Sequence, residues 1–370
     1  MISNDPPSPV EPWRKSAMDR LSQVRISPEA DIAAAGRQLD ETGLGALVVC
    51  ADDGRFRALL TDGDFRRAIL DNLDMTQSCE TIATREPVSL PREFSRKEAI
   101  EQLNHGKAFP VNHLPIVDAD QILLGLLLRR DLFQSDGLQM EAVIMAGGFG
   151  KRLRPLTVDT PKPMLPVGGQ PLLERIIGRM SRAGIQRINV TTHHSPQKIM
   201  SHFGDGSEFG VDINYVNEDQ PLGTAGSLGL IAEPTKPLLV MNGDILTDID
   251  FEAMLAFHQT HEAALTVAVR QYDFKVPYGV MCCDGHVVQG VSEKPVQSFL
   301  VNAGIYMIEP SVHRDIPSDR RMDMTEFIEL NLSKGRRVVS FPVIEYWLDI
   351  GQHEDFERAN EDIRRGVVRS

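Results

Sequence analysis

From residue 142 onward, the chain alternates short apolar segments with longer amphipathic ones. The apolar segments are typical of buried strands and span residues 142–145, 188–191, 212–215, 237–241 and 264–269. Helical patterns cover residues 171–183, 222–233 and 251–260. This alternation indicates βαβ units, and therefore an α/β domain with a mainly parallel sheet. In open sheets of this kind the ligand site lies beyond the carboxyl ends of the strands.

Composition narrows the class of protein. The 370 residues are 42% hydrophobic and 25% charged, which is ordinary globular usage and room for two or three domains. A net charge of -13 makes nucleic acid an unfavourable partner. Four cysteines without a CxxC pair indicate neither zinc nor a disulfide framework, so we expect a cytoplasmic protein. The longest apolar run, 122–128, is interrupted by Gly125, which supports no membrane span.

The first third of the chain contains a duplicated pattern. Residues 1–16 are rich in proline, and we expect a flexible arm there. The order helix, strand, strand, helix then occurs twice, with strands at 46–49 and 57–61 and again at 113–117 and 123–128. Two such units would pack on each other to cover their apolar faces, which predicts one domain over 17–137. A polar hinge at 134–137 precedes a second domain, 140–370.

The duplicated region resembles a tandem CBS (Bateman) module, an α+β fold. The segment from Leu59 to Phe65 carries the family's Thr-x-x-Asp pattern at Thr61 and Asp64, whereas the second copy keeps only Asp131. The resemblance implies an adenine nucleotide at these residues. Thr61 could equally be the N-cap of a helix starting at Asp62. The module could also serve only as a dimerisation scaffold, and we expect a homo-oligomer.

A glycine-rich run follows the first strand of the second domain. It reads Ala-Gly-Gly-Phe-Gly-Lys-Arg over 146–152 and is followed by Pro-Lys-Pro at 161–163. Glycines let backbone N–H groups approach phosphate oxygens, while Arg152 and Lys162 would neutralise charge. Arg152 stands where a Walker loop has Ser or Thr, and Leu153 where a dinucleotide fingerprint has its third glycine. The run therefore predicts a triphosphate site of another kind.

The run closely resembles the signature GGxGxRLxPLT…PKPxLPV of the sugar-1-phosphate nucleotidyltransferases, which have a Rossmann-like fold. Further motifs follow in the family's order at 218–226, 242–244, 278–280, 293–295, 302–304 and 347–351. The resemblance implies a catalytic set of Arg152, Lys162 and Asp244. It assigns the nucleotide to Ala146, Gly147, Gly148, Gly150, Glu218, Gly223 and Thr224. It assigns the sugar phosphate to Gly279, Glu293, Lys294 and Asn302, and a metal to Asp244 and Asp349.

Each of these residue types suits its task. Magnesium prefers oxygen ligands and retains waters, so two carboxylates and phosphate oxygens form an expected set for Mg²⁺. Lys294 can pair with a phosphate as a point charge, and Glu293 can accept from sugar hydroxyls. The alternative for Glu293 and Lys294 is a surface ion pair before Pro295. His193 and His194 could touch the sugar or cap the next helix.

The resemblance implies that the substrates are an NTP and a sugar 1-phosphate. Two acceptor oxygens on Glu218 suit the paired donors of guanine, which favours GTP over UTP, unless Glu218 is a solvated loop residue. A tandem CBS module ahead of the transferase resembles the glucosamine-1-phosphate guanylyltransferases of legionaminic acid pathways, and mannose 1-phosphate is the alternative acceptor. A hypothesis of another class is an adenine-nucleotide sensor whose transferase domain is inactive.

Overall fold

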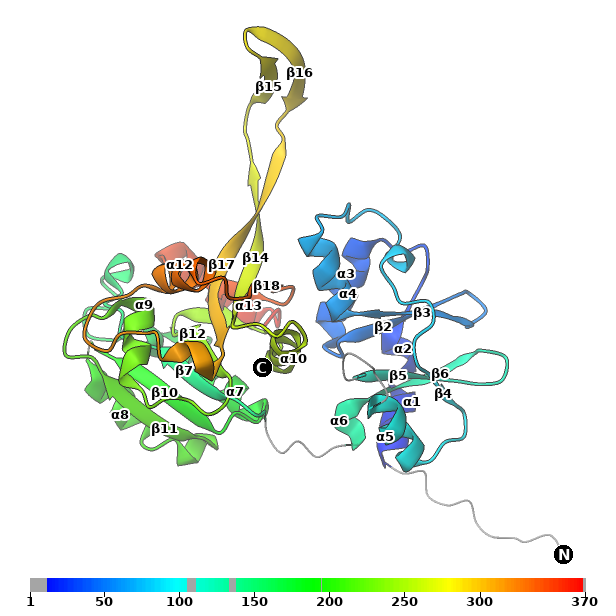
Figure 1. Cartoon of the computed structure of the whole chain (residues 1–370), viewed down its shortest axis with the longest axis horizontal. Coiled ribbons are helices and arrows are strands. Elements are labelled where there is room, and N and C mark those ends of the chain that lie inside the picture. Colours follow the sequence, from blue (N-terminus) through cyan, green and yellow to red (C-terminus); the bar gives the residue numbers. More distant parts are fainter. Residues whose placement is uncertain (1–11, 105–110, 133–137, 194, 369–370) are drawn as a thin grey trace, which may run out of the picture. The chain divides into compact units, whose positions relative to one another are not determined.

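The computed structural model describes residues 12–104, 111–132, 138–193 and 195–368 (Figure 1). The chain divides into two compact units, Met1–Asp136 and Gly137–Ser370. The hinge predicted at 134–137 lies outside the described residues. Among those that are described, no helix is long and apolar enough to cross a membrane.

The first unit contains two sheets of three strands, β1-β2-β3 and β4-β5-β6. The first repeat consists of α3 (Ile32–Thr42), β2 (Ala46–Cys50), β3 (Phe56–Thr61) and α4 (Asp62–Leu70). The second consists of α5 (Arg96–Asn104), β5 (His113–Val117), β6 (Leu123–Leu128) and α6 (Arg129–Leu132). The remaining elements are α1 (Pro12–Asp19), α2 (Leu21–Val24), β1 (Arg25–Ile26), η1 (Cys79–Thr81) and β4 (Leu90–Pro91). The duplicated helix–strand–strand–helix order is confirmed.

The two repeats pack on each other, as the sequence predicted. The Phe56 amide donates to the Gln121 carbonyl at 2.8 Å, and the Leu123 amide donates to the Gly54 carbonyl at 3.1 Å. Strands of both repeats also contribute to one hydrophobic cluster, which contains Ala46, Val48, Leu59, Val117, Leu123, Leu126 and Leu128. Each repeat thus buries its apolar face against the other.

One expectation for the N-terminus is wrong. Residues 12–16, which we expected to lie in a flexible arm, belong to α1. Proline is tolerated at the first position of a helix, so Pro12 can begin α1. The Trp13 ring packs 5.6 Å from that of Phe94, and Ala17 is fully buried. Residues 1–11 lie outside the described part of the chain.

A seven-stranded sheet of order β11-β10-β7-β12-β17-β14-β18 forms the second unit. Strands β11, β10, β7 and β12 are parallel, β17 is antiparallel to both neighbours, and β18 is parallel to β14. The sheet strands are β7 (Glu141–Met145), β10 (Arg187–Thr192), β11 (Asp212–Asn217), β12 (Leu238–Asn242), β14 (Leu265–Lys275), β17 (Val296–Ile308) and β18 (Val338–Pro342). The predicted α/β class with a mainly parallel sheet is confirmed.

Short strand pairs and helices complete this unit. The pairs are β8 (Pro166–Val167) with β9 (Gln170–Pro171), β13 (Ile245–Thr247) with β19 (Trp347–Asp349), and β15 (Gly279–Asp284) with β16 (Val287–Glu293). The α-helices are α7 (Leu172–Arg182), α8 (Pro196–Phe203), α9 (Gly223–Gly226), α10 (Phe251–Thr260), α11 (Pro310–His313), α12 (Met324–Ser333) and α13 (His353–Arg364). Short 3-10 turns are η2 (Lys151–Leu153), η3 (Lys162–Met164), η4 (Ser207–Phe209) and η5 (Ser227–Leu230).

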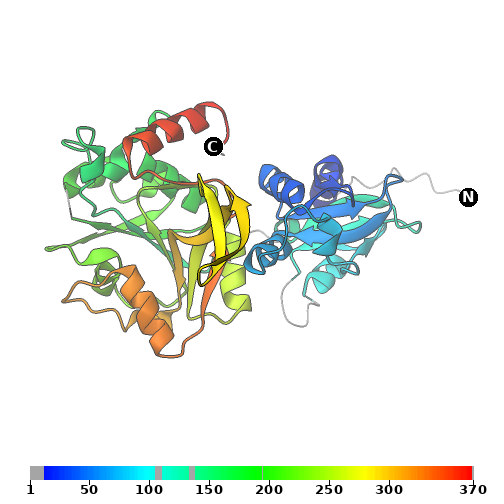
Figure 2. The ribbon, with the colours of Figure 1, turned by 90° about the horizontal axis from the view of Figure 1, so that it is seen from above.

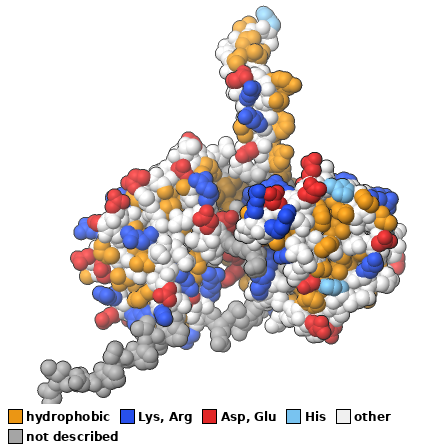
Figure 3. Space-filling view, turned by 180° about the vertical axis from the view of Figure 1, so that it is seen from behind, with side chains coloured by type: hydrophobic (Ala, Val, Ile, Leu, Met, Phe, Trp, Pro, Cys, Tyr) orange, Lys and Arg blue, Asp and Glu red, His pale blue; other side chains and the backbone are white. Residues whose placement is uncertain are grey.

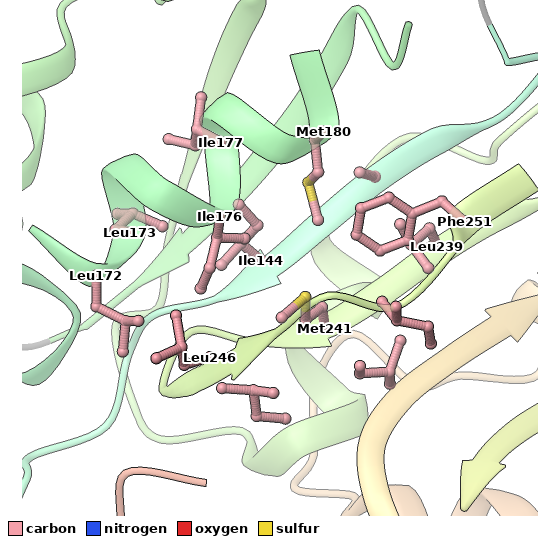
Figure 4. Packing of buried hydrophobic residues seen from close by; sticks show 14 of the residues in the cluster. Ile144, Leu172, Leu173, Ile176, Ile177, Met180, Leu239, Met241, Leu246 and Phe251 are labelled. Carbon is pink, nitrogen blue, oxygen red and sulfur yellow. The ribbon is translucent and has the colours of Figure 1, made fainter. Parts of the chain in front are cut away.

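Hydrophobic side chains cover both faces of the sheet. Alternate residues of one strand point to opposite faces, so Ile144 packs on one side and Val143 on the other. On the first face Ile144 and Met241 meet α7 through Ile176 and its neighbours (Figure 4). Figure 2 shows α13, in red, and α12, in orange, on opposite sides of the sheet. The sheet, packed on both faces, thereby positions the loops at its edge.

The predicted helix over 222–233 is wrong. Only α9 and the short turn η5 form there. A Cβ at Gly229 would lie 2.5 Å from the Pro317 carbonyl oxygen, and one at Gly226 would lie 3.1 Å from that of Arg320. The segment is therefore shaped by close backbone approach to residues 317–323, which a local helix pattern does not report.

Strand β14 is longer than the predicted 264–269. It continues to Lys275 and pairs with β17 as a twisted two-stranded ribbon that projects from the unit and ends in β15 and β16 (Figure 1). We call residues 271–300 the arm. Every residue of the arm is exposed except Val276, Gly290 and Pro295, which are half-buried.

Candidate active site

The glycine-rich loop leaves the carboxyl end of β7, at the centre of the parallel strands. The Ala146 amide donates to the Thr191 carbonyl at 2.9 Å, which ties the loop to β10. Gly150 has a φ of 58°, a conformation that favours glycine, and the Thr157 hydroxyl donates to its carbonyl at 2.8 Å. A Cβ at Gly148 would meet nothing within 4 Å, so this part of the loop faces open space where a phosphate can approach.

Lys162 and Asp244 form an ion pair beside this loop. The Lys162 ammonium donates to Oδ2 of Asp244, and Lys162 is only 8% exposed. Asp244 comes two residues after β12, and the Gly243 amide donates to the Met145 carbonyl at 2.9 Å. That bond places Asp244 directly next to the start of the loop. The sequence prediction that Lys162 and Asp244 share one site agrees with this geometry.

Asp349 reaches the same place from the far end of the chain. Strands β13 and β19 are antiparallel, with Ile245 opposite Asp349. The Ile350 amide donates to the Asp244 carbonyl at 3.0 Å, and the Trp347 indole donates to the Ala303 carbonyl at 2.9 Å. The fold therefore joins two carboxylates more than a hundred residues apart in sequence, which spacing alone does not show.

The electrostatics of this pair fit a bound cation. Asp349 is partly accessible to solvent, yet its pKa is raised. The larger cause is desolvation of its carboxyl, and the second is the nearby charge of Asp244. Lys162 and Arg152 oppose that rise. Oδ1 of Asp244 is buried without a hydrogen-bond partner among the described residues. A divalent ion would supply the missing partner and relieve the repulsion between the two carboxylates.

The ion would depend on substrate for the rest of its ligands. The described residues contain no group of three or more His, Cys, Asp or Glu side chains placed to hold a metal. Two carboxylates with phosphate oxygens and water match the preference of Mg²⁺, which is usually held by one or two carboxylates plus substrate phosphates. The residues present thus fit a metal that arrives with a nucleotide.

Glu218 is a buried carboxylate at the edge of the same loop. It is 7% exposed, and its Oε2 accepts from the Leu222 amide at 3.0 Å. Its Oε1 would lie 3.0 Å from a Cβ at Gly147, so the carboxylate packs against the loop. Burial raises the pKa of Glu218, against the opposing effects of the Leu222 amide and His193. The reading of Glu218 as a solvated loop residue is therefore wrong.

An aromatic pair lies beside Glu218, and of its two members only His193 was singled out from the sequence. The His193 Nδ1 donates to the Glu218 carbonyl at 2.7 Å, and its ring meets the Phe149 ring edge-on at 5.4 Å. Phe149 remains 41% exposed. A bulky aromatic residue inside a glycine-rich phosphate loop was the available signal. The N-cap of α8 is Ser195 rather than His193, and His194 lies outside the described residues.

Gly223 and Thr224, assigned to the nucleotide, contact another segment of the chain. The Thr224 hydroxyl accepts from the Met324 amide at 2.8 Å, and the Thr224 amide donates to the Asp323 carboxylate at 3.3 Å. Gly223 has a φ of 81°, and a Cβ there would lie 2.5 Å from Asp323 Oδ1. Both residues therefore anchor the loop after β11 to the start of α12.

Three residues assigned to the sugar phosphate lie elsewhere. Gly279, Glu293 and Lys294 are exposed on the arm, which projects from the sheet (Figure 1), so the structure does not bring them to Asp244 and Asp349. Asn302 lies at the root of the arm, where its Oδ1 accepts from the Gly304 amide at 2.9 Å. Lys294 has a φ of 47°, which makes a tight turn before Pro295.

In the first unit, the predicted ligand residues are already paired with protein groups. Thr61 and Asp64 form a capping box for α4, in which the Thr61 amide donates to the Asp64 carboxylate at 2.8 Å. The Arg67 guanidinium also pairs with Asp64. The Asp131 carboxylate accepts from the Arg20 guanidinium at 2.5 and 2.7 Å. The capping reading of Thr61 is confirmed, and adenine-nucleotide binding stays a prediction.

Comparison with known proteins identifies the families to which the two units are similar. Residues 141–366 match the Nucleotidyl transferase family, and residues 17–71 and 79–136 each match the CBS domain. The chain is 34% identical over 241 residues to a mannose-1-phosphate guanylyltransferase of Mycobacterium tuberculosis, covering 63% of this chain and 67% of that protein. It is 34% identical over 227 residues to a mannose-1-phosphate guanyltransferase of Candida albicans, covering 59% and 62%.

A solved structure shares the fold of the second unit. It is a Bacillus anthracis protein assigned as a glucose-1-phosphate thymidylyltransferase, in complex with sucrose, with 27% identity and a TM-score of 0.51. The match covers 61% of this chain and 95% of that chain. The matched part of the chain spans about two thirds of the length of the two guanylyltransferases described above. Because the family match covers more than half of the residues, the chain belongs to the Nucleotidyl transferase family and carries two CBS domains ahead of that domain.

Proposed function

We propose that this protein transfers a nucleotidyl group from an NTP, with GTP preferred, to a hexose 1-phosphate and releases pyrophosphate. The observation that carries the proposal is the cluster beyond the carboxyl ends of β7 and β12. There the Lys162–Asp244 pair and Asp349 lie next to an open glycine loop. The intact cluster argues against an inactive sensor, which would have no use for a buried carboxylate oxygen without a partner.

The chemistry needs positioning and charge neutralisation rather than a covalent enzyme intermediate. A phosphate oxygen of the sugar 1-phosphate would attack the α-phosphorus, and the bond to the pyrophosphate oxygen would break. Loop amides of 147–150 would hold the triphosphate, with Arg152 and Lys162 stabilising the charge that develops on it. Asp244 and Asp349 would hold Mg²⁺, which supplies Lewis-acid polarisation of the phosphate oxygens when bound.

Guanine preference is supported by Glu218 and by the relatives. With Oε2 bonded to Leu222, the remaining acceptor directions of this buried carboxylate suit the adjacent N–H donors of guanine. Both curated relatives described above are named for guanylyl transfer to mannose 1-phosphate. Those names favour mannose 1-phosphate as acceptor, and the glucosamine 1-phosphate expected from the sequence has no support from them.

The test is a mass-spectrometric screen of four NTPs against mannose, glucosamine and glucose 1-phosphates, with and without Mg²⁺. We expect a GDP-sugar as the main product and its loss when a chelator removes the metal. Lys162→Gln and Asp244→Asn should lower turnover roughly 100-fold or more while the melting temperature shows a folded chain.

The matched controls change the same residue types at the opposite, amino-terminal side of the sheet. Lys236→Ala lies just before β12 and Asp212→Ala at the first residue of β11, and both positions are exposed. These variants should keep full turnover. Turnover near that of the wild type in Lys162→Gln or Asp244→Asn would refute the assigned site, and a UDP-sugar as main product would refute the base preference.

A further inference from the structure

The arm extends two strands of the core sheet. Pairing between β14 and β17 runs from Leu265 opposite Ile308, inside the core, to Lys275 opposite Val296, with one irregularity between Val267 and Val269. The Val276 amide then donates to the Pro295 carbonyl at 2.9 Å. Beyond that irregularity the pairing is unbroken from Val269 to Lys275, and it places β15 and β16 away from the unit from which they emerge (Figure 1).

One face of the arm's end combines apolar side chains with a predicted acceptor residue. Cross-strand partners share a face, and residues two apart on one strand do so as well. The register of β15 and β16 therefore defines a tip face, made of Gly279, Met281, Cys283, Val288, Val291 and Glu293. Met281, Val288 and Val291 are 57%, 56% and 60% exposed, and apolar side chains line the arm in Figure 3.

Such a surface is unfavourable in water on its own. An isolated two-stranded hairpin is at best marginally stable, and contiguous exposed apolar patches mark interaction sites. Tyr272 and Phe299 form a further exposed aromatic pair across the ribbon, at 56% and 51% exposure. The arm therefore presents apolar surface that suits a partner, and the β14–β17 pairing directs it away from its own unit (Figure 1).

We propose that the arm docks on the second unit of another copy of this chain and delivers Glu293 and Lys294 to that copy's nucleotide site. The inference rests on the proposed function, because it takes these two residues as the ones that bind the sugar phosphate. The site within one copy holds Lys162, Asp244 and Asp349 but not Glu293 and Lys294, which lie on the arm, so it is completed in trans. Reciprocal exchange of an identical element gives a closed two-fold dimer.

The geometry explains why the apolar residues and Glu293 lie together. When Met281 and Val291 are buried against a partner, Glu293 is carried on the same face into the contact. The Glu293 carboxylate already lies over Gly279, with Oε2 3.0 Å from the position of a Cβ there. The rim of the glycine loop offers apolar surface for the contact, since Phe149, Leu156 and Val158 are 41%, 39% and 58% exposed.

The decisive experiment is complementation between two inactive full-length variants. Asp244→Asn has a defective core site and an intact arm, whereas a Glu293→Ala, Lys294→Ala double variant has the reverse. Co-expressed with different tags and purified through both, the mixed dimer contains one complete site. We expect each variant alone to lose turnover roughly 100-fold and the mixed dimer to recover about half of the wild-type turnover, one site of two.

Three results would overturn the inference. A mixed dimer as inactive as its parents would show that the arm serves its own copy. Full activity of the Glu293→Ala, Lys294→Ala variant would remove both residues from the site. A wild-type chain that forms no nucleotide sugar with any NTP and acceptor would defeat the proposed function itself, and with it this use of the arm.

A second measurement does not depend on activity. Met281→Asp with Val291→Asp places two charges on the tip face, and Val280→Asp with Val287→Asp places two on the opposite face of the same strands. Sedimentation should show a dimer for the wild type and for the opposite-face control. The tip-face variant should dissociate at concentrations at least about tenfold higher than the control, since buried charge opposes docking. Equal dissociation of both variants, or a monomeric wild type, would contradict docking.

Discussion

At the scale of single residues, the buried carboxylate of Glu218 lowers the stability of the folded chain when it is ionised. Burial raises its pKa above the ordinary value of 4.5, so the folded chain holds the proton more tightly than the unfolded chain does. The protonated Glu218 therefore contributes its full stabilisation of the folded chain below about pH 4.5. That stabilisation is lost as the pH rises through the raised pKa. A donor pair on guanine would compensate for this loss when nucleotide binds.

Glu218→Gln tests this account. Glutamine keeps an acceptor for the Leu222 amide but cannot ionise, so the variant should melt at a higher temperature than the wild type at neutral pH. The difference should shrink as the pH falls toward about 4. Thermal melts at several pH values check this, with the exposed Glu208→Gln as control.

The same variant should also lose preference for GTP over UTP, measured as the ratio of the two kcat/KM values. A loss of roughly tenfold would match one impaired pair of hydrogen bonds. If the pH-dependent stability gain is present but the ratio is unchanged, Glu218 shapes the loop and other groups select the base.

At the scale of elements, α4 begins with a complete capping box at Thr61 and Asp64. Thr61→Ala removes the hydroxyl that accepts from the Asp64 amide and should lower the free energy of unfolding of the first unit by about 1 kcal/mol. Urea unfolding of the full chain checks the value. Thr42→Ala is the control, because that hydroxyl only donates to the Leu39 carbonyl within α3. Equal effects of both substitutions would mean that the box contributes little.

Elements with a local signal were predicted well. Helix α10 has the bounds expected from the sequence, Phe251–Thr260, because Asp250 caps it and its apolar residues recur at helical spacing. The segment at 222–233 failed because its glycines serve close contacts with residues 317–323. Helix α1 was missed because its partner, Phe94, lies far away in sequence. Long-range packing decided both cases, and a local pattern does not contain it.

The candidate site divides in the same way. Lys162, Asp244 and Asp349 were identified from motifs, and the sheet brings them together because β12 and β19 end beside the loop after β7. Glu293 and Lys294 were assigned from motifs to the same site, but the β14–β17 ladder carries them outward. A motif gives the residue type needed for a task, whereas the path of the strand through the fold decides where that residue lies.

At the scale of the whole molecule, the proposed self-association has two candidate sources. The arm belongs to the second unit, and the tandem CBS repeats belong to the first. Every residue assigned to the reaction also lies in the second unit. A chain that begins at residue 138 therefore retains the whole candidate site and the whole arm but lacks the repeats.

We expect that shortened chain to remain a dimer and to keep turnover within about threefold of the full chain, since arm exchange needs only the second unit. Sedimentation and the nucleotide-sugar assay measure the two quantities on one preparation. AMP, ADP or ATP should alter turnover only in the full chain if the repeats bind them, because the shortened chain has no such site. A folded, monomeric and inactive shortened chain that regains activity when the CBS repeats are restored would instead identify the repeats as the dimerisation scaffold.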